Sequence, residues 1–518
     1  MKRFENMRVI SIYVMFIVLT IGVFLCKKNF HVDELLSYGL ANDSYGLVMS
    51  VEDGVKYEPA ERPFVNYLSV NAGEGFNYRY VWENQAIDVH PPLFYAVLHT
   101  ICSFFPGQFS VWYAGVINIA FGLLTLMALR KLMDELFDDA FVKDAISVVF
   151  VLTAEVLVMV SFLRMYIMAM FWVTLSTWFF VKQVGKKWEL KDYLLIFVIS
   201  VLSALTHYYC VVYLIFICVV YGVWLLLEKK WKEVVAFAGT MVAAAGTAIV
   251  IFPAMLEHVF SGYRGTQSIK NFANASVTDY VNRLKGFYEF FDVQLFGGLL
   301  SVGLVLLIIG GLAFNAEKKD LKTNVVGIKW LLLLIPSVLY FAVIAKMAVY
   351  IEERYISPIF AVVIVLFLGA LYGGLSQVCY DKAKKFVLVV ISAIMVVNGW
   401  KSVEWRYLYK GSEAYIEKTE SYSDVECIMI YDMLYKTHMS YLEAANYKSI
   451  TFLHADSSGW LADMDIANNE ELIVVLISQE EEKLSEVIEM CPNLDGYEKI
   501  GAFGYGTTYY LYGLDLEN

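Results

Sequence analysis

Long apolar stretches separated by short polar segments fill the chain from the N-terminus to about residue 401. Eleven of these stretches approach the roughly 20 apolar residues with which a helix crosses the about 30 Å hydrocarbon core of a bilayer. We therefore predict a polytopic α-helical protein of the cell membrane. Its crossings are expected at residues 7–26, 110–129, 141–161, 165–181, 192–206, 208–227, 233–253, 293–314, 328–350, 356–375 and 384–401.

The segment PPLFYAVLHTICSFF, at residues 91–105, is apolar but shorter than the predicted crossings. Its two prolines mark a helix start, because proline is well tolerated in the first helical turn. Counting this segment as a crossing would reverse the side of every later loop. We therefore interpret it as a re-entrant or interfacial helix.

Five of the loops between the predicted crossings carry several Lys or Arg residues, and Lys and Arg accumulate in cytoplasmic loops. The five loops contain the sequences LRKLMDELFDDAFVK, VKQVGKKWELK, LEKKWKE, NAEKKDLK and YDKAKK. Eleven crossings place all of them in the cytoplasm, together with the N-terminus, and place the C-terminal segment outside. The pair Lys27 and Lys28, on the outer side, departs from this rule.

The apolar pattern changes beyond residue 401, where short stretches alternate with helix-like segments. The stretches ECIMIYD, SITFLH, LIVVLIS and GTTYYLYGL are typical of the strands of a small α/β module. We predict a membrane-embedded domain at residues 1–401, with outer loops at 27–90 and 254–292, and an extracytoplasmic α/β domain at 402–518.

Composition supports this division. Hydrophobic residues make up 59% of the 518 residues and charged residues only 18%, whereas soluble proteins carry about a quarter charged residues. Residues 402–518 hold 7 Lys and Arg against 22 Asp and Glu, as expected of a separate solvated module. No basic face with interleaved aromatic residues indicates nucleic-acid binding. Cys427 and Cys491 could pair outside the cytoplasm, although two cysteines make no disulfide framework.

The predicted topology brings polar side chains from distant segments to the outer membrane boundary. Each has an ordinary structural interpretation: Asp33 could cap a helix, and Arg164 could extend from a helix end toward water. Their shared side and depth favours an interfacial active site instead. The candidate residues are Asp33, Glu34, Asp88, His90, Arg164, Tyr166, His207, Tyr208, Lys346, Glu353, Arg354 and Tyr355.

The order of these motifs resembles the C-type (GT-C) integral-membrane glycosyltransferases, in the branch of bacterial relatives of protein O-mannosyltransferases and aminoarabinose transferases. The motifs are HVDELLSYG, DVHPPLFYAVLH, RMY, THYY and ERYISP, and the resemblance covers residues 7–401. The pattern D-x-HPPL-Y is the most specific of them. The resemblance implies transfer of a hexosyl or pentosyl group from a polyprenyl phosphate to an extracytoplasmic acceptor, with inversion at the anomeric carbon.

The resemblance also implies that the acid just after the first crossing is the general base. In this chain that residue is Asp33, with Glu34 beside it as a donor-side or structural partner. A positioned carboxylate that accepts the proton of an attacking hydroxyl typically accelerates transfer by about 10²–10⁴-fold. Adjacent helical residues point about 100° apart, so we expect only one of the two acids to reach the acceptor.

The remaining candidates fit the donor side of such a reaction. Arg and Lys suit a leaving phosphate, because Arg offers a bidentate fork and Lys a point charge. Arg354, Lys346 and Arg164 are the candidates for this role, in that order. Asp88 and His90 would hold sugar hydroxyls or orient the base. The pocket would be lined by Tyr166, His207, Tyr208 and Tyr355, and Glu353 is a further candidate for substrate binding.

This chain departs from the family at Phe162-Leu163-Arg164, where many relatives carry Glu-Ala-Arg. The second acid is missing, and a monophosphate-linked donor needs no divalent ion to leave. We therefore predict no obligatory cofactor or metal, with a divalent ion as the alternative. The partners would be membrane lipid, the lipid-linked sugar and a glycan, lipid or protein acceptor.

Two other classes of function remain as alternatives. A transporter or flippase of a lipid-linked sugar would also carry charges in its membrane segments, but transporters often show paired half-chain repeats, which are not evident here. A membrane-anchored receptor or assembly protein that uses the acidic tail would leave the boundary charges unexplained.

Overall fold

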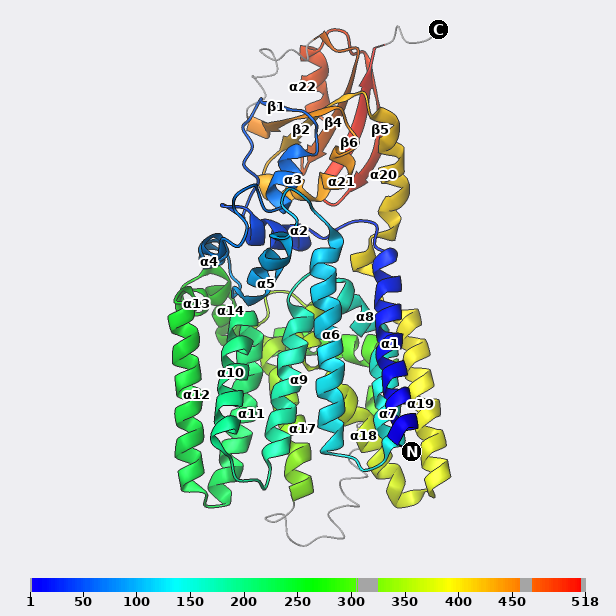
Figure 1. The fold of residues 1–518 in the computed structure, drawn as a ribbon. Coiled ribbons are helices and arrows are strands. Elements are labelled where there is room, and N and C mark those ends of the chain that lie inside the picture. The colour runs from blue at the N-terminus through cyan, green and yellow to red at the C-terminus, as the bar shows by residue number, and fades with distance from the viewer. Residues whose placement is uncertain (1, 304, 306–324, 457–467, 514–518) are drawn as a thin grey trace. The chain divides into compact units, whose positions relative to one another are not determined.

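The computed structural model describes residues 2–303, 305, 325–456 and 468–513 (Figure 1). The chain forms two compact units. The helical unit comprises Met1–Val23, Val89–Phe94 and Gly115–Trp405, and the sheet unit comprises Phe24–Asp88, Tyr95–Ala114 and Arg406–Asn518.

The helical unit contains the predicted crossings. Its helices are α1 (Lys2–Leu25), α6 (Val111–Asp134), α7 (Ala140–Leu152), α8 (Ala154–Ser161), α9 (Tyr166–Gln183), α10 (Leu190–Thr206), α11 (Tyr208–Leu227), α12 (Trp231–Ile251), α17 (Val325–Met347), α18 (Phe360–Val378) and α19 (Asp381–Ser402). They run side by side as a bundle, with α11 packed against α9, α12 and α17 (Figure 1).

Among the described residues, seven helices are long and apolar enough to cross a membrane, or eight if the bent pair α7–α8 is one span. The helices α9 and α10, of 18 and 17 residues, lie at two further predicted crossings. Part of the predicted crossing at 293–314, residues 304 and 306–314, falls outside the described residues. The structure therefore confirms a multi-pass helical architecture, while the number of eleven crossings stays a prediction. The helix α5 (Leu93–Cys102), with 10 residues, is too short to cross a bilayer.

The second outer loop folds into short helices that pack on the end of α17. They are α13 (Ala254–Phe260), α14 (Tyr263–Asn274), α15 (Val277–Glu289) and the π-helix η1 (Phe290–Leu295). The guanidinium of Arg283 on α15 donates to the carbonyls of Ala345 and Ala348. It thereby satisfies acceptors that every helix leaves without a partner at its C-terminus.

Within the described residues, the sheet unit is built on six strands in the order β1-β3-β2-β4-β6-β5. The strands β2 (Glu426–Tyr431), β3 (Ser449–His454) and β4 (Glu471–Ile477) are parallel, and β6 (Gly506–Tyr512) and β5 (Gly496–Phe503) complete the sheet in antiparallel fashion. Four of these strands lie at the four stretches predicted from sequence, which confirms the α/β module. The strand β5 escapes the sequence pattern because three consecutive residues, Tyr497 to Lys499, are exposed.

The first outer loop belongs to the same unit as the tail, whereas the sequence grouped it with the membrane domain. Its short strand β1 (Lys56–Tyr57) pairs antiparallel with β3. The loop also holds the helices α2 (Val32–Asn42), α3 (Arg62–Leu68) and α4 (Tyr78–Ile87). On α3, Phe64 lies against Phe452 of β3, with 5.9 Å between ring centroids. Strand pairing and aromatic packing thus join segments almost 400 residues apart in sequence.

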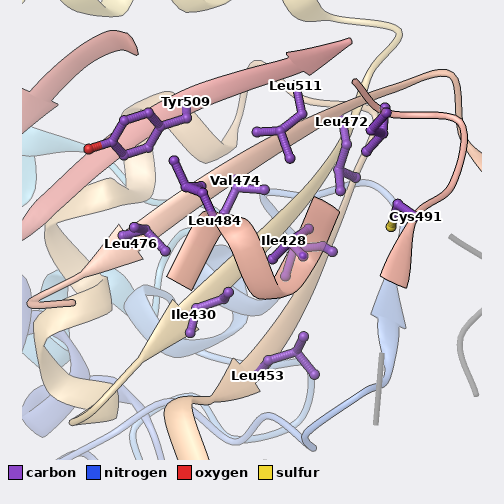
Figure 2. Packing of buried hydrophobic residues seen from close by; sticks show 12 residues of the cluster. Ile428, Ile430, Leu453, Leu472, Val474, Leu476, Leu484, Cys491, Tyr509 and Leu511 are labelled. Atoms are coloured by element: carbon purple, nitrogen blue, oxygen red, sulfur yellow. The ribbon is translucent and has the colours of Figure 1, made fainter. Parts of the chain in front are cut away.

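One face of the sheet is covered by α22 (Lys483–Met490) (Figure 2). Leu484 on this helix packs with Ile428, Val474 and Leu511 in the buried cluster that Figure 2 shows. Cys491 lies in the same cluster. Side chains alternate between faces along a strand, so Cys427 faces the opposite side of the sheet from its neighbour Ile428. The two cysteines form no disulfide with each other.

Candidate functional site

The turn between α8 and α9 presents Arg164 and is held from a third helix. The side chain of Asn118, on α6, donates to the carbonyls of Val160 at 3.0 Å and Phe162 at 2.6 Å. Backbone groups without a partner are costly in hydrocarbon, and Asn118 supplies two of the bonds that this helix end needs. The turn that follows Phe162 is fixed in this way.

A break in the preceding helix is stabilised in the same manner. The helices α7 and α8 meet at an angle of 51°, with Thr153 in an extended conformation between them. The indole of Trp400, on α19, donates to the carbonyl of Leu152 at 2.7 Å. Glu155, buried in the first turn of α8, sits where a helix N-terminus favours negative charge.

Arg164 lies beside two histidines from other segments. Its Nη2 is 3.3 Å from Nε2 of His90, and the ring centroid of His90 is 6.0 Å from that of His207. His207 joins α10 to α11 and caps the latter, since its Nδ1 accepts from the backbone N–H of Tyr209 at 3.1 Å. Tyr166 also packs against His207, with 5.5 Å between centroids.

Arg354 extends the same group from the turn before α18. It lies in the short helix η3 (Glu353–Tyr355), and its guanidinium carbon is 5.7 Å from the ring centroid of Phe162 and 5.4 Å from that of Tyr355. The hydroxyl of Tyr340 holds this turn by donating to the carbonyl of Tyr355 at 2.7 Å.

The pKa of His207 reflects its burial and the positive charges of its neighbours in this group. Burial, followed by the charges of His90, Arg164 and Arg354, holds the pKa of His207 well below its ordinary value. His207 is therefore neutral in the folded protein near neutral pH. We call His90, Arg164, His207 and Arg354 the cationic cluster, after the two arginines that carry its charge. Its two guanidinium groups make it suited to an anionic ligand.

Two residues predicted for the same site contact the second outer loop instead. The ammonium of Lys346 lies over the ring of Phe272, at 4.5 Å from the centroid, and 5.7 Å from that of Tyr280. The hydroxyl of Tyr208 hydrogen-bonds Nδ1 of His258 at 2.7 Å. Both side chains thus pack on α13–α15.

Asp33 lies in the sheet unit, in the first turn of α2. The imidazole of His31 caps this helix, because its Nδ1 accepts from the backbone N–H of Asp33 at 3.0 Å. The same Nδ1 is 3.8 Å from the Asp33 carboxylate, whose side chain is 28% exposed. Asp33 therefore combines a fixed backbone with a side chain that water reaches.

Glu34 has a different environment. Its carboxylate accepts from the backbone N–H of His31 at 2.7 Å, which completes a capping box, and forms an ion pair with Lys27 at 2.9 Å. Of the two roles predicted for Glu34, the structure shows the contacts of the structural one. The neighbouring Lys28 pairs with Glu413, so both outer-side lysines that depart from the charge rule have acidic partners.

Asp88 ends the part of the first loop that belongs to the sheet unit. It follows α4, and its backbone N–H donates to the carbonyl of Asn84 at 3.0 Å. His90, two residues later, belongs to the helical unit. The acid and the histidine of the D-x-H motif therefore belong to different units.

The described parts of the chain contain no group of three or more His, Cys, Asp or Glu side chains that could hold a metal ion. The cationic cluster offers imidazoles, but its guanidinium groups are not metal ligands. That the protein needs no obligatory metal stays a prediction.

Sequence reasoning missed Asn118 and Lys27. Asn118 lies within an apolar crossing, and polar residues in such segments are costly and usually functional, so its position was a usable signal. Lys27 was noticed only as an exception to the charge rule. Its partner Glu34 is seven residues away, and no local pattern links the two.

Comparison with known proteins shows the fold. No protein-family model and no curated protein matches the chain. The solved structure of ArnT from Cupriavidus metallidurans bound to undecaprenyl phosphate is similar, with 11% identity, a TM-score of 0.53 and coverage of 97% of both chains. The Archaeoglobus fulgidus oligosaccharyltransferase in the apo form also matches, with 10% identity, a TM-score of 0.45 and coverage of 96% of this chain and 70% of that one. The likeness to ArnT confirms the GT-C resemblance at the level of the fold.

Proposed function

We propose that this protein is an inverting glycosyltransferase that moves a sugar from a polyprenyl phosphate to an acceptor hydroxyl outside the cytoplasm. The observation that carries the proposal is the cationic cluster, in a chain whose fold resembles that of ArnT over almost its full length. The ArnT structure holds undecaprenyl phosphate, a ligand with the chemistry that such a cluster would bind.

The cluster suits the donor because charge develops on the phosphate as the sugar leaves. A sugar-linked phosphodiester carries one negative charge, and the released polyprenyl phosphate carries up to two. Guanidinium groups that are already in place stabilise the second charge more than the first, so they favour the transition state over the bound donor. Arg164 is 4% exposed, and its interaction with a phosphate would be only weakly screened by water.

Asp33 would be the general base. The acceptor oxygen attacks the anomeric carbon, the bond from that carbon to the phosphate oxygen breaks, and the hydroxyl proton passes to the Asp33 carboxylate. Glu34 is buried in the helix cap, whereas the Asp33 carboxylate is partly exposed. Of the two adjacent acids, Asp33 is therefore the one that an acceptor can reach.

The alternative of a transporter or flippase is supported by the bent pair α7–α8, since broken helices are common in transporters. The two functions differ in whether a covalent bond breaks. The purified protein can be incubated with hexosyl or pentosyl derivatives of undecaprenyl phosphate, and the products analysed by mass spectrometry. A transferase releases sugar-free undecaprenyl phosphate, whereas a transporter leaves the derivative intact.

The donor site can be tested without knowledge of the sugar. Binding of undecaprenyl phosphate to the protein in detergent should weaken by about 10-fold or more for Arg164→Leu and Arg354→Leu, because each loses a charge-assisted hydrogen bond. Arg264→Leu is the matched control, because this arginine stacks on Tyr263 and Tyr350 of the helical unit. Equal affinity in the wild type and all three variants would contradict the donor assignment.

The base can be tested in the transfer reaction. We expect Asp33→Asn to lower turnover by about 10²–10⁴-fold with little change in the KM for the donor. Glu83→Gln is the control, because this acid of the same loop makes an exposed pair with Arg79. Full turnover by Asp33→Asn would refute the base assignment.

A further inference from the structure

Lys27 and Glu34 form a deeply buried ion pair. The side chain of Lys27 is 2% exposed and that of Glu34 is 0% exposed. The ammonium contacts both carboxylate oxygens, at 2.9 and 3.0 Å, and also donates to the carbonyl of Tyr407 at the start of the tail. The pair thus connects the end of the first crossing, the helix α2 and the tail.

Such a pair is not needed for stability alone. Removing two charges from water is costly, and well-packed apolar residues of similar size often stabilise a fold equally well. Burial lowers the pKa of Lys27, against the opposing effect of Glu34, which reflects the same desolvation cost. What an ion pair adds is a defined geometry, because both ends must meet at a set distance and angle.

That geometry is transmitted to Asp33 through two further hydrogen bonds. The Glu34 carboxylate that Lys27 holds also accepts from the backbone N–H of His31. The imidazole of His31 in turn accepts from the backbone N–H of Asp33. Three consecutive contacts therefore lead from the ammonium of Lys27 to the backbone of the acid.

We propose that Lys27 is a positioning residue for the transfer reaction, and that it aligns Asp33 by clamping the start of α2 to the backbone of the tail at Tyr407. This inference rests on the proposed function, because it assigns a task to the support of the proposed base. The C-terminal segment then takes part in catalysis, because it anchors the clamp. It would be more than a separate module that only binds the acceptor.

Lys28 provides a matched control on the neighbouring residue. It also pairs with an acid of the tail, Glu413, but the two side chains are 35% and 46% exposed. Exposed pairs contribute little, because water competes for both charges. If attachment to the tail were all that mattered, Lys27→Met and Lys28→Met would have similar effects.

The test compares Lys27→Met, Glu34→Gln, the double variant and Lys28→Met in the full-length protein. With undecaprenyl-phosphate hexose and pentose donors, we expect Lys27→Met to lower kcat by about 10- to 100-fold, the loss that a misplaced catalytic group can cause, while the donor KM changes less than about twofold. The double variant leaves no lone charge buried, but it still lacks the donor to the carbonyl of Tyr407. We therefore expect it to keep most of the loss, and full recovery of kcat would overturn the clamp, because an unpaired buried charge would then account for the loss. Lys28→Met should match the wild type.

Amide hydrogen exchange in α2 supplies a second readout that needs no substrate. We expect faster exchange at the start of α2 in Lys27→Met and in the double variant, and near wild-type exchange in Lys28→Met. Wild-type kcat in Lys27→Met, or an equal loss in Lys28→Met, would overturn the proposal. If the wild type transfers no sugar, the proposed function fails, and unchanged exchange in Lys27→Met would then overturn the clamp independently.

Discussion

His438 should make the stability of the sheet unit depend on pH in a way that can be calculated. It lies in the short helix η8 (Leu434–Ser440) and is 1% exposed. Its ring stacks on Tyr67 of the first outer loop, with 4.4 Å between centroids. Burial lowers the pKa of His438 to about 3, because the surroundings disfavour the imidazolium.

The sign and size of the effect follow from the two pKa values. An unfolded histidine has a pKa of about 6.5, so above this pH both states are neutral and His438 contributes no pH dependence. Below it, only the unfolded chain takes up the proton, and the free energy of unfolding falls by about 1.4 kcal/mol per pH unit until about pH 3. Between about pH 7.5 and 5, the expected loss is about 2 kcal/mol.

The assay is native-state hydrogen exchange of the amides of β2 and β4 in the full-length protein, corrected for the intrinsic effect of pH on exchange. Its variant, His438→Phe, keeps an aromatic ring against Tyr67 but cannot titrate. Glu443 acts in the opposite sense, since burial raises its pKa, so only the difference between wild type and variant isolates residue 438.

His438→Asn serves as the control for stacking, because it removes both the ring and the titration. We expect the pH-dependent loss of about 2 kcal/mol in the wild type and its absence in both variants. The same pH dependence in the wild type and in His438→Phe would refute the reasoning.

Three further predictions follow from the packing. Asn118→Ala removes two hydrogen bonds to carbonyls at the end of α8, each worth about 0.5–1.5 kcal/mol, and should weaken undecaprenyl phosphate binding several-fold through the loosened Arg164 turn; unchanged affinity would contradict this. Gly39→Ala should lower the melting temperature, because its Cβ would lie 1.9 Å from Cζ of the buried Tyr67, and an unchanged melting temperature would argue against this packing. Mass spectrometry of the non-reduced protein should detect no disulfide between Cys427 and Cys491, and a linked peptide pair would disprove their placement on opposite faces of the sheet.

The sequence by itself determined the class of the protein, the position of most crossings and four of the tail strands. These features depend on the length and alternation of apolar residues within single segments, so they can be predicted without knowing which segments meet. The motifs around His90, Arg164 and Arg354 were also visible, and the structure brings these three side chains around His207.

Only the tertiary structure decided which distant segments support each other. The first outer loop adds β1 to the tail sheet, Lys346 turns to the second outer loop, and Lys27 joins Glu34 to the carbonyl of Tyr407. The partners of β1 and Lys346 lie in separate segments of the chain, as does the carbonyl of Tyr407. Glu34 is close to Lys27 in sequence, but the two pair because both are buried together. Ion pairs, edge strands and aromatic contacts of this kind depend on distances in space, which no periodicity along one segment can specify.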